Sequence, residues 1–276
     1  MSTGNELRKP MTRRVLLTAG GLTLLAGCTS TPVERMTSTA QTNPGPKART
    51  PHPAKHPDPT PSSRGSDGTG PKGSPGKGGD DRPVYYVDDG PKAIALTIDD
   101  GPNAIYTPQV LRLLAKYKVT ATFSMIGIEV TAEPALAREV AAHGHVISNH
   151  TWRHLDLAAL APSAVIAEMD RATEAIHRAT GDTPAVFRAP YGAWSSTVLR
   201  HCEATRMLPL DWSVDPEDWA RPGVSAIVGN IMRNTRTGSI ILEHDGGGNR
   251  AETVAALGIV IPRLLDKGYH FVSPLT

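Results

Sequence analysis

Two histidines and a pair of aspartates are the residues of this 276-residue sequence whose types and spacing best suit chemistry. The segment "ISNHTWRHLDL" (147–157) places His150 and His154 four positions apart, so both imidazoles can lie on the same side of a helical turn or tight loop. Asp156 adds a carboxylate beside them. The spacing alone leaves two interpretations open: a pair of metal ligands, or two of ten histidines that fall close together by chance.

The segment "TIDDGP" (97–102) ends a predicted strand with two adjacent carboxylates, Asp99 and Asp100. Asp-Gly-Pro is also favourable turn chemistry. Two like charges side by side repel each other, however, and a bound cation would relieve that repulsion. One aspartate with two histidines makes three protein ligands and leaves a position open, which is the pattern of catalytic zinc. The other aspartate would be free to act as a base.

Further reactive side chains follow other predicted strands, namely Arg188, Asp218 and His244. In α/β barrels the loops after the strands converge on one mouth, and chemistry is done there. The recurrence of such residues at five strand ends therefore favours a single shared site.

The elements that must position these residues begin near Val84, where strand-like and helix-like stretches start to alternate. Short apolar, β-branched runs predict strands. Proline near the start and glycine at the end of a stretch predict helices, with Thr107 as an expected helix cap. The alternation predicts one α/β domain with a parallel sheet, open or closed into a barrel. We expect strands at 92–98, 119–126, 185–190, 207–214 and 239–245, and helices at 107–117, 133–144, 163–180, 224–235 and 252–267.

The first 28 residues are typical of a targeting segment rather than of the fold. Arg13 and Arg14 precede an apolar run, and the run ends in Leu-Ala-Gly-Cys at Cys28. This pattern resembles a bacterial lipoprotein signal, in which cleavage before Cys28 leaves that thiol as the lipid anchor, and the paired arginines also resemble a twin-arginine signal. An uncleaved amino-terminal anchor is the alternative. Each interpretation places the domain outside the cytoplasm, lipid-anchored at the outer face of the bacterial membrane or secreted.

Residues 29–82 are predicted to form a disordered tether, and residues 83–276 the catalytic domain. From Gln41 to Arg82 the apolar side chains other than proline are Ala48 and Ala54, too few to offset the entropy of ordering. The net charge of +2 with no basic stripe argues against nucleic acid as a partner. If Cys28 carries lipid, Cys202 has no disulfide partner.

Five segments, in chain order, resemble the motifs of the polysaccharide deacetylases of carbohydrate esterase family 4, which share a chitooligosaccharide deacetylase homology domain. "TIDDGP" resembles the first motif, with Ile98 where phenylalanine is usual. "HTWRH" resembles the second, with Arg153 where a small hydroxyl residue is common. Both departures concern substrate fit rather than chemistry. The remaining three are "RAPYG" (188–192), "DW" (218–219) and "ILEHD" (241–245).

The resemblance implies a distorted, incomplete (β/α) barrel with about seven parallel strands, and a role for each matched residue. Asp100, His150 and His154 would be the metal ligands. The implied catalytic residues are Asp99 as base, His244 as acid, Asp218 as the partner of His244 and Arg188 as the partner of Asp99, and the implied substrate or oxyanion contacts are Tyr191, Pro190, Trp219 and Leu242.

Alternatives remain for two of these residues. Arg188 could form a purely structural ion pair, and Asp211 or Asp215 could take the place of Asp218, because "DWSVDPEDW" contains two Asp-Trp steps. The match to the motif favours Asp218, and Trp212 is then expected in the core.

The expected activity is metal-dependent removal of N-acetyl groups from glycan that contains N-acetylglucosamine, by attack of metal-bound water. Peptidoglycan is the first expected substrate because of the anchor, and chitooligosaccharides remain possible. Zinc is the default metal, with cobalt, nickel or manganese as alternatives. The rival hypotheses are an O-acetyl esterase acting on acetylxylan and an inactive wall-binding lipoprotein. We expect a monomer.

Overall fold

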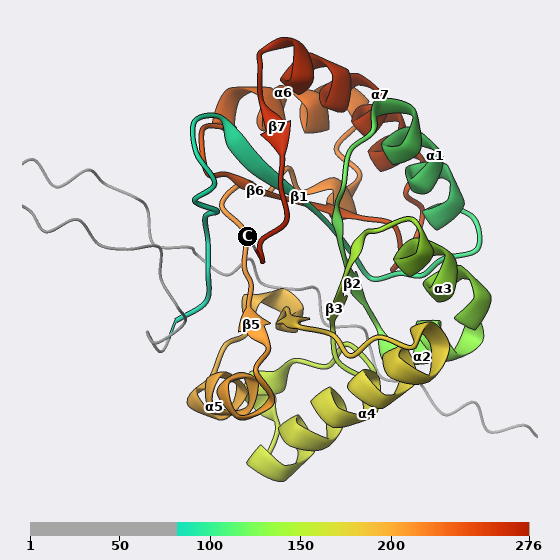
Figure 1. Cartoon of the computed structure of the whole chain (residues 1–276), viewed down its shortest axis with the longest axis vertical. Helices are drawn as coiled ribbons and strands as arrows, with labels where there is room; N and C mark the ends of the chain where they lie inside the picture. The colour runs from blue at the N-terminus through green and yellow to red at the C-terminus, as the bar shows by residue number, and fades with distance from the viewer. Residues whose placement is uncertain (1–81, 276) are drawn as a thin grey trace, which may run out of the picture. The chain divides into compact units, whose positions relative to one another are not determined.

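A computed structural model describes residues 82–275, and their strands form one seven-stranded sheet (Figure 1). The order is β5-β4-β3-β2-β1-β6, β7 pairs with the beginning of β1, and every one of these pairings is parallel. The strands are β1 (Ala93–Asp99), β2 (Thr122–Met125), β3 (Val146–Asn149), β4 (Val186–Phe187), β5 (Leu208–Pro209), β6 (Ile240–His244) and β7 (His270–Phe271).

The sheet curls into an incomplete barrel, with β5 at one end of the strand order and β6 at the other. The segment before β1 contacts both ends, since Val84 bridges Leu210 just after β5 and Tyr86 bridges Ser239 just before β6. The predicted fold, a distorted and incomplete (β/α) barrel with about seven parallel strands, is confirmed.

The helices cover the outside of the curled sheet (Figure 1). Successive residues of a strand point to opposite faces. In β1 the side chains of Ile94, Leu96 and Ile98 join the apolar cluster under the helices, whereas Ala95 joins the cluster inside the barrel. Both faces of β1 are therefore buried, which explains its nearly continuous apolar sequence. The helices are α1 (Thr107–Tyr117), α2 (Gly127–Ala132), α3 (Pro134–Ala142), α4 (Pro162–Thr180), α5 (Ser196–Thr205), α6 (Val224–Asn234) and α7 (Ala251–Asp266).

The predicted helices agree with the structure to within two residues, and each predicted strand overlaps an observed one, although the ranges 119–126, 185–190 and 207–214 extend beyond β2, β4 and β5. The predicted ranges include neither β3 nor β7. Two helices, α2 and α5, were not predicted. The start of α5 does carry a local signal, because the Ser195 hydroxyl accepts a hydrogen bond from the Val198 amide. The expectation that Thr107 caps α1 is wrong. Thr107 lies inside the helix, and its hydroxyl donates to Asp245 instead.

The predicted signal segment with Cys28, and residues 29–81 of the predicted tether, lie outside the described residues, so these predictions stand as made. Cys202 is a free and buried thiol, and burial raises its pKa to about 12. Across residues 82–275, none of the helices combines the length and the apolar character needed to cross a membrane.

Candidate active site

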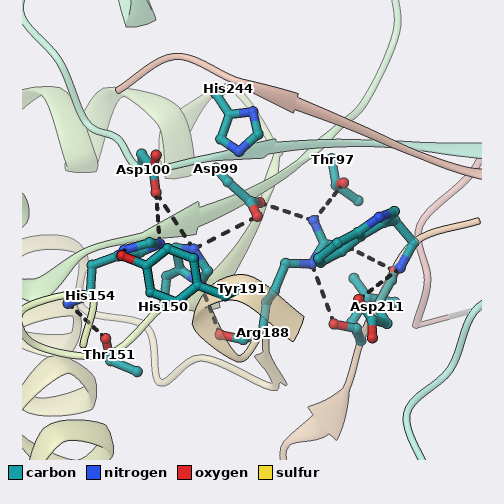
Figure 2. Close-up of polar contacts among 12 residues, drawn as sticks. Thr97, Asp99, Asp100, His150, Thr151, His154, Arg188, Tyr191, Asp211 and His244 are labelled. Atoms are coloured by element: carbon teal, nitrogen blue, oxygen red, sulfur yellow. Dashed lines mark hydrogen bonds and ion pairs between the residues drawn. The ribbon is translucent and has the colours of Figure 1, made fainter. Parts of the chain in front are cut away.

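Asp100, His150 and His154 converge at the carboxyl ends of β1 and β3 (Figure 2). One ligand atom from each side chain lies within 4.8 Å of the others. The Nε2 atoms of His154 and His150 lie 3.3 and 3.6 Å from Asp100 Oδ1. Zinc–ligand bonds of about 2.1 Å at tetrahedral angles separate neighbouring ligand atoms by about 3.4 Å. The spacing of these side chains therefore fits one small divalent cation.

The surroundings of Asp100 also fit a cation. Its Oδ1 is buried and accepts no hydrogen bond from any described residue. Gly246 and Gly247 pack against it, and a Cβ atom at Gly247 would come within 2.6 Å of Asp100 Oδ2. A buried carboxylate oxygen without a donor is costly unless a positive charge neutralises it. The donor set of one carboxylate and two imidazoles suits zinc, and also cobalt, nickel or manganese.

His150 is held in the form that a metal ligand needs. Its Nδ1 lies 2.8 Å from the Arg188 carbonyl oxygen, so Nδ1 carries the proton and Nε2 presents its lone pair toward Asp100. Burial and the neighbouring His154 lower the pKa of His150 to about 3. The imidazole is consequently neutral at any physiological pH.

His154 is oriented from two sides. Its backbone amide donates to the Thr151 hydroxyl, and its Nδ1 lies 3.2 Å from the Tyr191 hydroxyl. Asp100, His154 and Tyr191 all have positive φ, of 74°, 58° and 59°. Left-handed backbone is unfavourable for such residues, and it persists where the surrounding structure enforces it, often at functional sites.

Asp99 pairs with the fully buried Arg188. Arg188 Nη1 donates to Asp99 Oδ1 over 2.9 Å and to the Thr97 hydroxyl, while Nη2 donates to the Asp211 carbonyl. The other carboxylate oxygen, Oδ2, faces His150 Nε2 at 3.8 Å. Arg188 therefore supplies the counter-charge for one oxygen of Asp99 and leaves the other directed at the metal cluster.

His244 at the end of β6 pairs with Asp218, not with Asp211 or Asp215. Its Nδ1 lies 2.6 Å from Asp218 Oδ1, and its backbone amide donates to Asp218 Oδ2. Burial would lower the pKa of His244, but the Asp218 carboxylate and its hydrogen bond outweigh burial and raise the pKa to about 9. Figure 2 shows His244 above the two aspartates, opposite His150 and His154.

The remaining predicted site residues lie around this centre. Tyr191 and Trp219 are exposed, Pro190 is buried in the turn after β4, and Leu242 lies inside the barrel near Trp212, which is in the core as expected. Asp156, the carboxylate beside the two histidines in the sequence, is not one of the three side chains of the metal cluster. Its side chain caps the short helix that begins at Leu157.

Sequence reasoning gave no role to Asp245, which shapes the "TIDDGP" turn. Its buried carboxyl group accepts a hydrogen bond from the Thr107 hydroxyl, and its backbone amide donates one to the Asp99 carbonyl oxygen. A Cβ atom at Gly101 would come within 2.4 Å of Asp245 Oδ1. Burial raises the pKa of Asp245 to about 7. The position of Asp245 beside His244 in the fifth motif was the available signal.

The sequence and the fold also resemble those of known proteins. A family model described as polysaccharide deacetylase matches residues 86–208. The chain is 42% identical over 191 residues to a chitooligosaccharide deacetylase of Sinorhizobium fredii, an alignment that covers 65% of this chain and 89% of that protein.

Solved structures share the fold. The Bc1960 peptidoglycan N-acetylglucosamine deacetylase superposes with a TM-score of 0.66 at 33% identity, covering 68% of this chain and 89% of that one. BA3943, a CE4 family pseudoenzyme from Bacillus anthracis, superposes with a TM-score of 0.65 at 26% identity, covering 70% of this chain and 67% of that one. The same fold thus occurs in a deacetylase and in a pseudoenzyme.

Proposed function

The chain belongs to the polysaccharide deacetylase family, and from that premise we propose that it removes N-acetyl groups from glycans that contain N-acetylglucosamine, cell-wall peptidoglycan first among them. The observation that carries the proposal is that three metal-ligand side chains, a buried carboxylate base and a histidine acid occupy one edge of the sheet. Since a pseudoenzyme has a similar fold, this complete set of side chains supports activity better than the fold does.

We propose zinc as the resident metal, held by Asp100, His150 and His154. When bound, it would act as a Lewis acid and lower the pKa of a water from 15.7 to about 7. The neutral His150 and the otherwise unpartnered Asp100 Oδ1 bind such a cation without first losing a proton or a hydrogen bond.

Asp99 acts as the general base. Arg188 fixes Oδ1 of Asp99, so only Oδ2 is free to accept the proton of the attacking water. Arg188 is itself held by the Thr97 hydroxyl and by two backbone carbonyls, so the carboxylate cannot rotate away from the metal side. A positioned base of this kind contributes about 10²–10⁴-fold to a rate.

His244 acts as the general acid. An amine leaves poorly as an anion, so the sugar nitrogen must gain a proton as the amide bond breaks. Asp218 holds Nδ1 of His244, which leaves Nε2 to donate that proton. With its pKa raised to about 9, His244 is protonated at neutral pH. One proton passes to Asp99 and one leaves His244, and the products are acetate and the free amino sugar.

The exposed residues around the metal cluster, Tyr191 and Trp219, would bind the sugar. The backbone N–H of Tyr191, which follows the buried Pro190, would stabilise the negative charge that develops on the acetyl oxygen. The exposed faces of Tyr191 and Trp219 suit stacking against pyranose rings, with Leu242 deeper in the barrel.

We further propose that lipid on Cys28 anchors the protein at the outer face of the membrane and that residues 29–82 span the distance to the cell wall. We also propose that the protein is a monomer. Cell fractionation tests the anchor: Cys28→Ala should move the protein from the membrane to the soluble fraction, and unchanged membrane association would contradict lipidation of Cys28.

Acetate release from a panel of peptidoglycan, chitin oligomers and acetylxylan tests the function, with zinc supplied and Asp99→Asn as the blank. We expect the highest kcat/KM on peptidoglycan. Release from acetylxylan alone would identify an O-acetyl esterase. No release from any glycan, by protein that holds one metal ion per chain, would identify an inactive wall-binding protein.

A further inference from the structure

Glu243 is a buried acid that the proposed mechanism does not use. It precedes His244 on β6 and is fully buried. Because side chains alternate along a strand, Glu243 points to the face opposite His244. That is the helix-covered face, where Ile241 and Ile98, the residue paired with Glu243 on β1, join the apolar cluster. A carboxyl group in such a layer is costly to bury without a partner.

The carboxyl group of Glu243 lies against that of Asp218. Within the described residues, neither Glu243 oxygen accepts an N–H or O–H hydrogen bond. Two ionised carboxylates in contact repel, whereas one neutral acid and one carboxylate share a proton in a strong hydrogen bond. Since Asp218 must be ionised to hold His244, Glu243 is the member of the pair that keeps the proton.

The charges around Glu243 support this assignment. Asp218 and Asp215 face it with negative charge, and Arg250 is the cation that faces it. Arg250 donates to the carbonyl oxygens of Gly246 and Trp219 and makes no ion pair with Glu243. Burial and the two aspartates raise the pKa of Glu243 well above its ordinary value.

We propose that Glu243 is a positioning residue, whose neutral carboxyl group donates a hydrogen bond to Asp218 and so moderates the hold of Asp218 on His244. The proposal rests on the proposed function. The Asp218 carboxylate already accepts three hydrogen bonds, from the backbone amide of His244, from the ring of His244 and from the Thr253 hydroxyl. A further donor stabilises the Asp218 carboxylate, so its attraction for the His244 proton is weaker. His244 then remains charged yet releases its proton more readily.

Two substitutions separate donation from packing. Glu243→Gln keeps a donor that cannot ionise, and Glu243→Leu removes the donor. Ile241→Ala is the matched control, because Ile241 is buried on the same face of β6 and its loss lowers stability without touching Asp218. All are made in the zinc-loaded full-length protein.

The first measurement is the titration of the His244 ring by NMR, which does not depend on turnover. Glu243→Leu should raise the midpoint by about one pH unit, the size of a lost neutral hydrogen bond, and lower kcat by about threefold to tenfold. Glu243→Gln and Ile241→Ala should leave the midpoint where it is in the parent protein. An unshifted midpoint in Glu243→Leu, or an equal shift in Glu243→Gln, overturns the proposal.

The second measurement is the melting temperature against pH. A group whose pKa is raised by folding gives stability that is complete below its unfolded pKa, 4.5, and is lost as pH rises toward the folded value. The parent should therefore lose melting temperature relative to Glu243→Gln as pH rises above about 5. Parallel curves overturn the neutral assignment. Absence of acetate release by the parent would overturn the proposed function alone, because both measurements still decide the state of Glu243.

Discussion

Two buried histidines at opposite sides of the site have opposite protonation states. His150 on the metal side has a pKa lowered to about 3 by burial and by His154. His244 on the acid side is also largely buried, yet its pKa rises to about 9 because the Asp218 carboxylate outweighs burial. The difference lies in what each Nδ1 atom meets: a backbone carbonyl oxygen at His150 and a carboxylate at His244.

This contrast assigns the chemistry of each side. A neutral imidazole has a lone pair for a cation and cannot serve as an acid, whereas an imidazolium has a proton to give and cannot bind a metal. The metal side is built on β1 and β3, and the acid side on β6 and the loops beside it. Each side can therefore be disabled separately by substitution.

The largest expected effect is loss of the metal. His154→Ala removes one of three ligands, and we expect zinc content to fall well below one per chain and kcat/KM to fall by about 10³-fold or more, since the cation supplies several kcal/mol. Metal analysis and acetate release measure the two effects. His143→Ala, at an exposed histidine outside the cluster, is the control. Unaltered zinc content in His154→Ala would remove His154 from the ligand set.

Asp99→Asn should separate metal binding from catalysis on the same side. The amide cannot accept the proton from water, so kcat should fall by about 10²–10⁴-fold while zinc stays bound. Asp156→Asn, whose side chain can still cap the short helix that begins at Leu157, should keep its activity. An unchanged kcat in Asp99→Asn would show that another group is the base.

Asp218→Asn tests the acid side through pH. Without the Asp218 carboxylate, burial opposes protonation and only Asp100 and Asp99 still favour it, so the pKa of His244 falls from about 9 toward its ordinary 6.5. The decline of kcat at alkaline pH should therefore begin at a lower pH than in the parent protein. At pH 8 we expect activity to fall by about 30-fold while the zinc content is unchanged. Asp215→Asn is the matched control, because Asp215 does not hydrogen-bond His244. If kcat in Asp218→Asn still declines only near pH 9, Asp218 does not set the charge of His244.

Much of this arrangement was accessible from the sequence, because its signals are local. Pro108 and the apolar spacing predict α1 over its observed length, and Gly181 marks the end of α4. The adjacent aspartates and the spacing of His150 and His154 predict a metal site before any fold is known.

Other features depend on packing that no local pattern contains. The hydrogen bond from His150 to the Arg188 carbonyl joins residues 38 positions apart, and it decides which imidazole nitrogen faces the metal. In the sequence, nothing distinguishes Glu243 from any other charged residue beside His244. Only the fold shows that it is buried against Asp218.

The smallest expected effect comes from the rim of the metal side. Tyr191→Phe removes the hydroxyl that lies 3.2 Å from His154 Nδ1 and leaves the exposed ring in place for the sugar. Loss of a partner that orients a metal-binding histidine typically lowers affinity by about 10–100-fold, and because His154 is also held through its backbone by Thr151 we expect about tenfold. Competition with a zinc chelator measures it. Tyr106→Phe, which removes a hydroxyl bonded to Asn249 away from the metal, is the matched control. Equal zinc affinity in the two variants would show that Thr151 alone orients His154, whereas a lower kcat at saturating zinc would place the Tyr191 hydroxyl on the substrate instead.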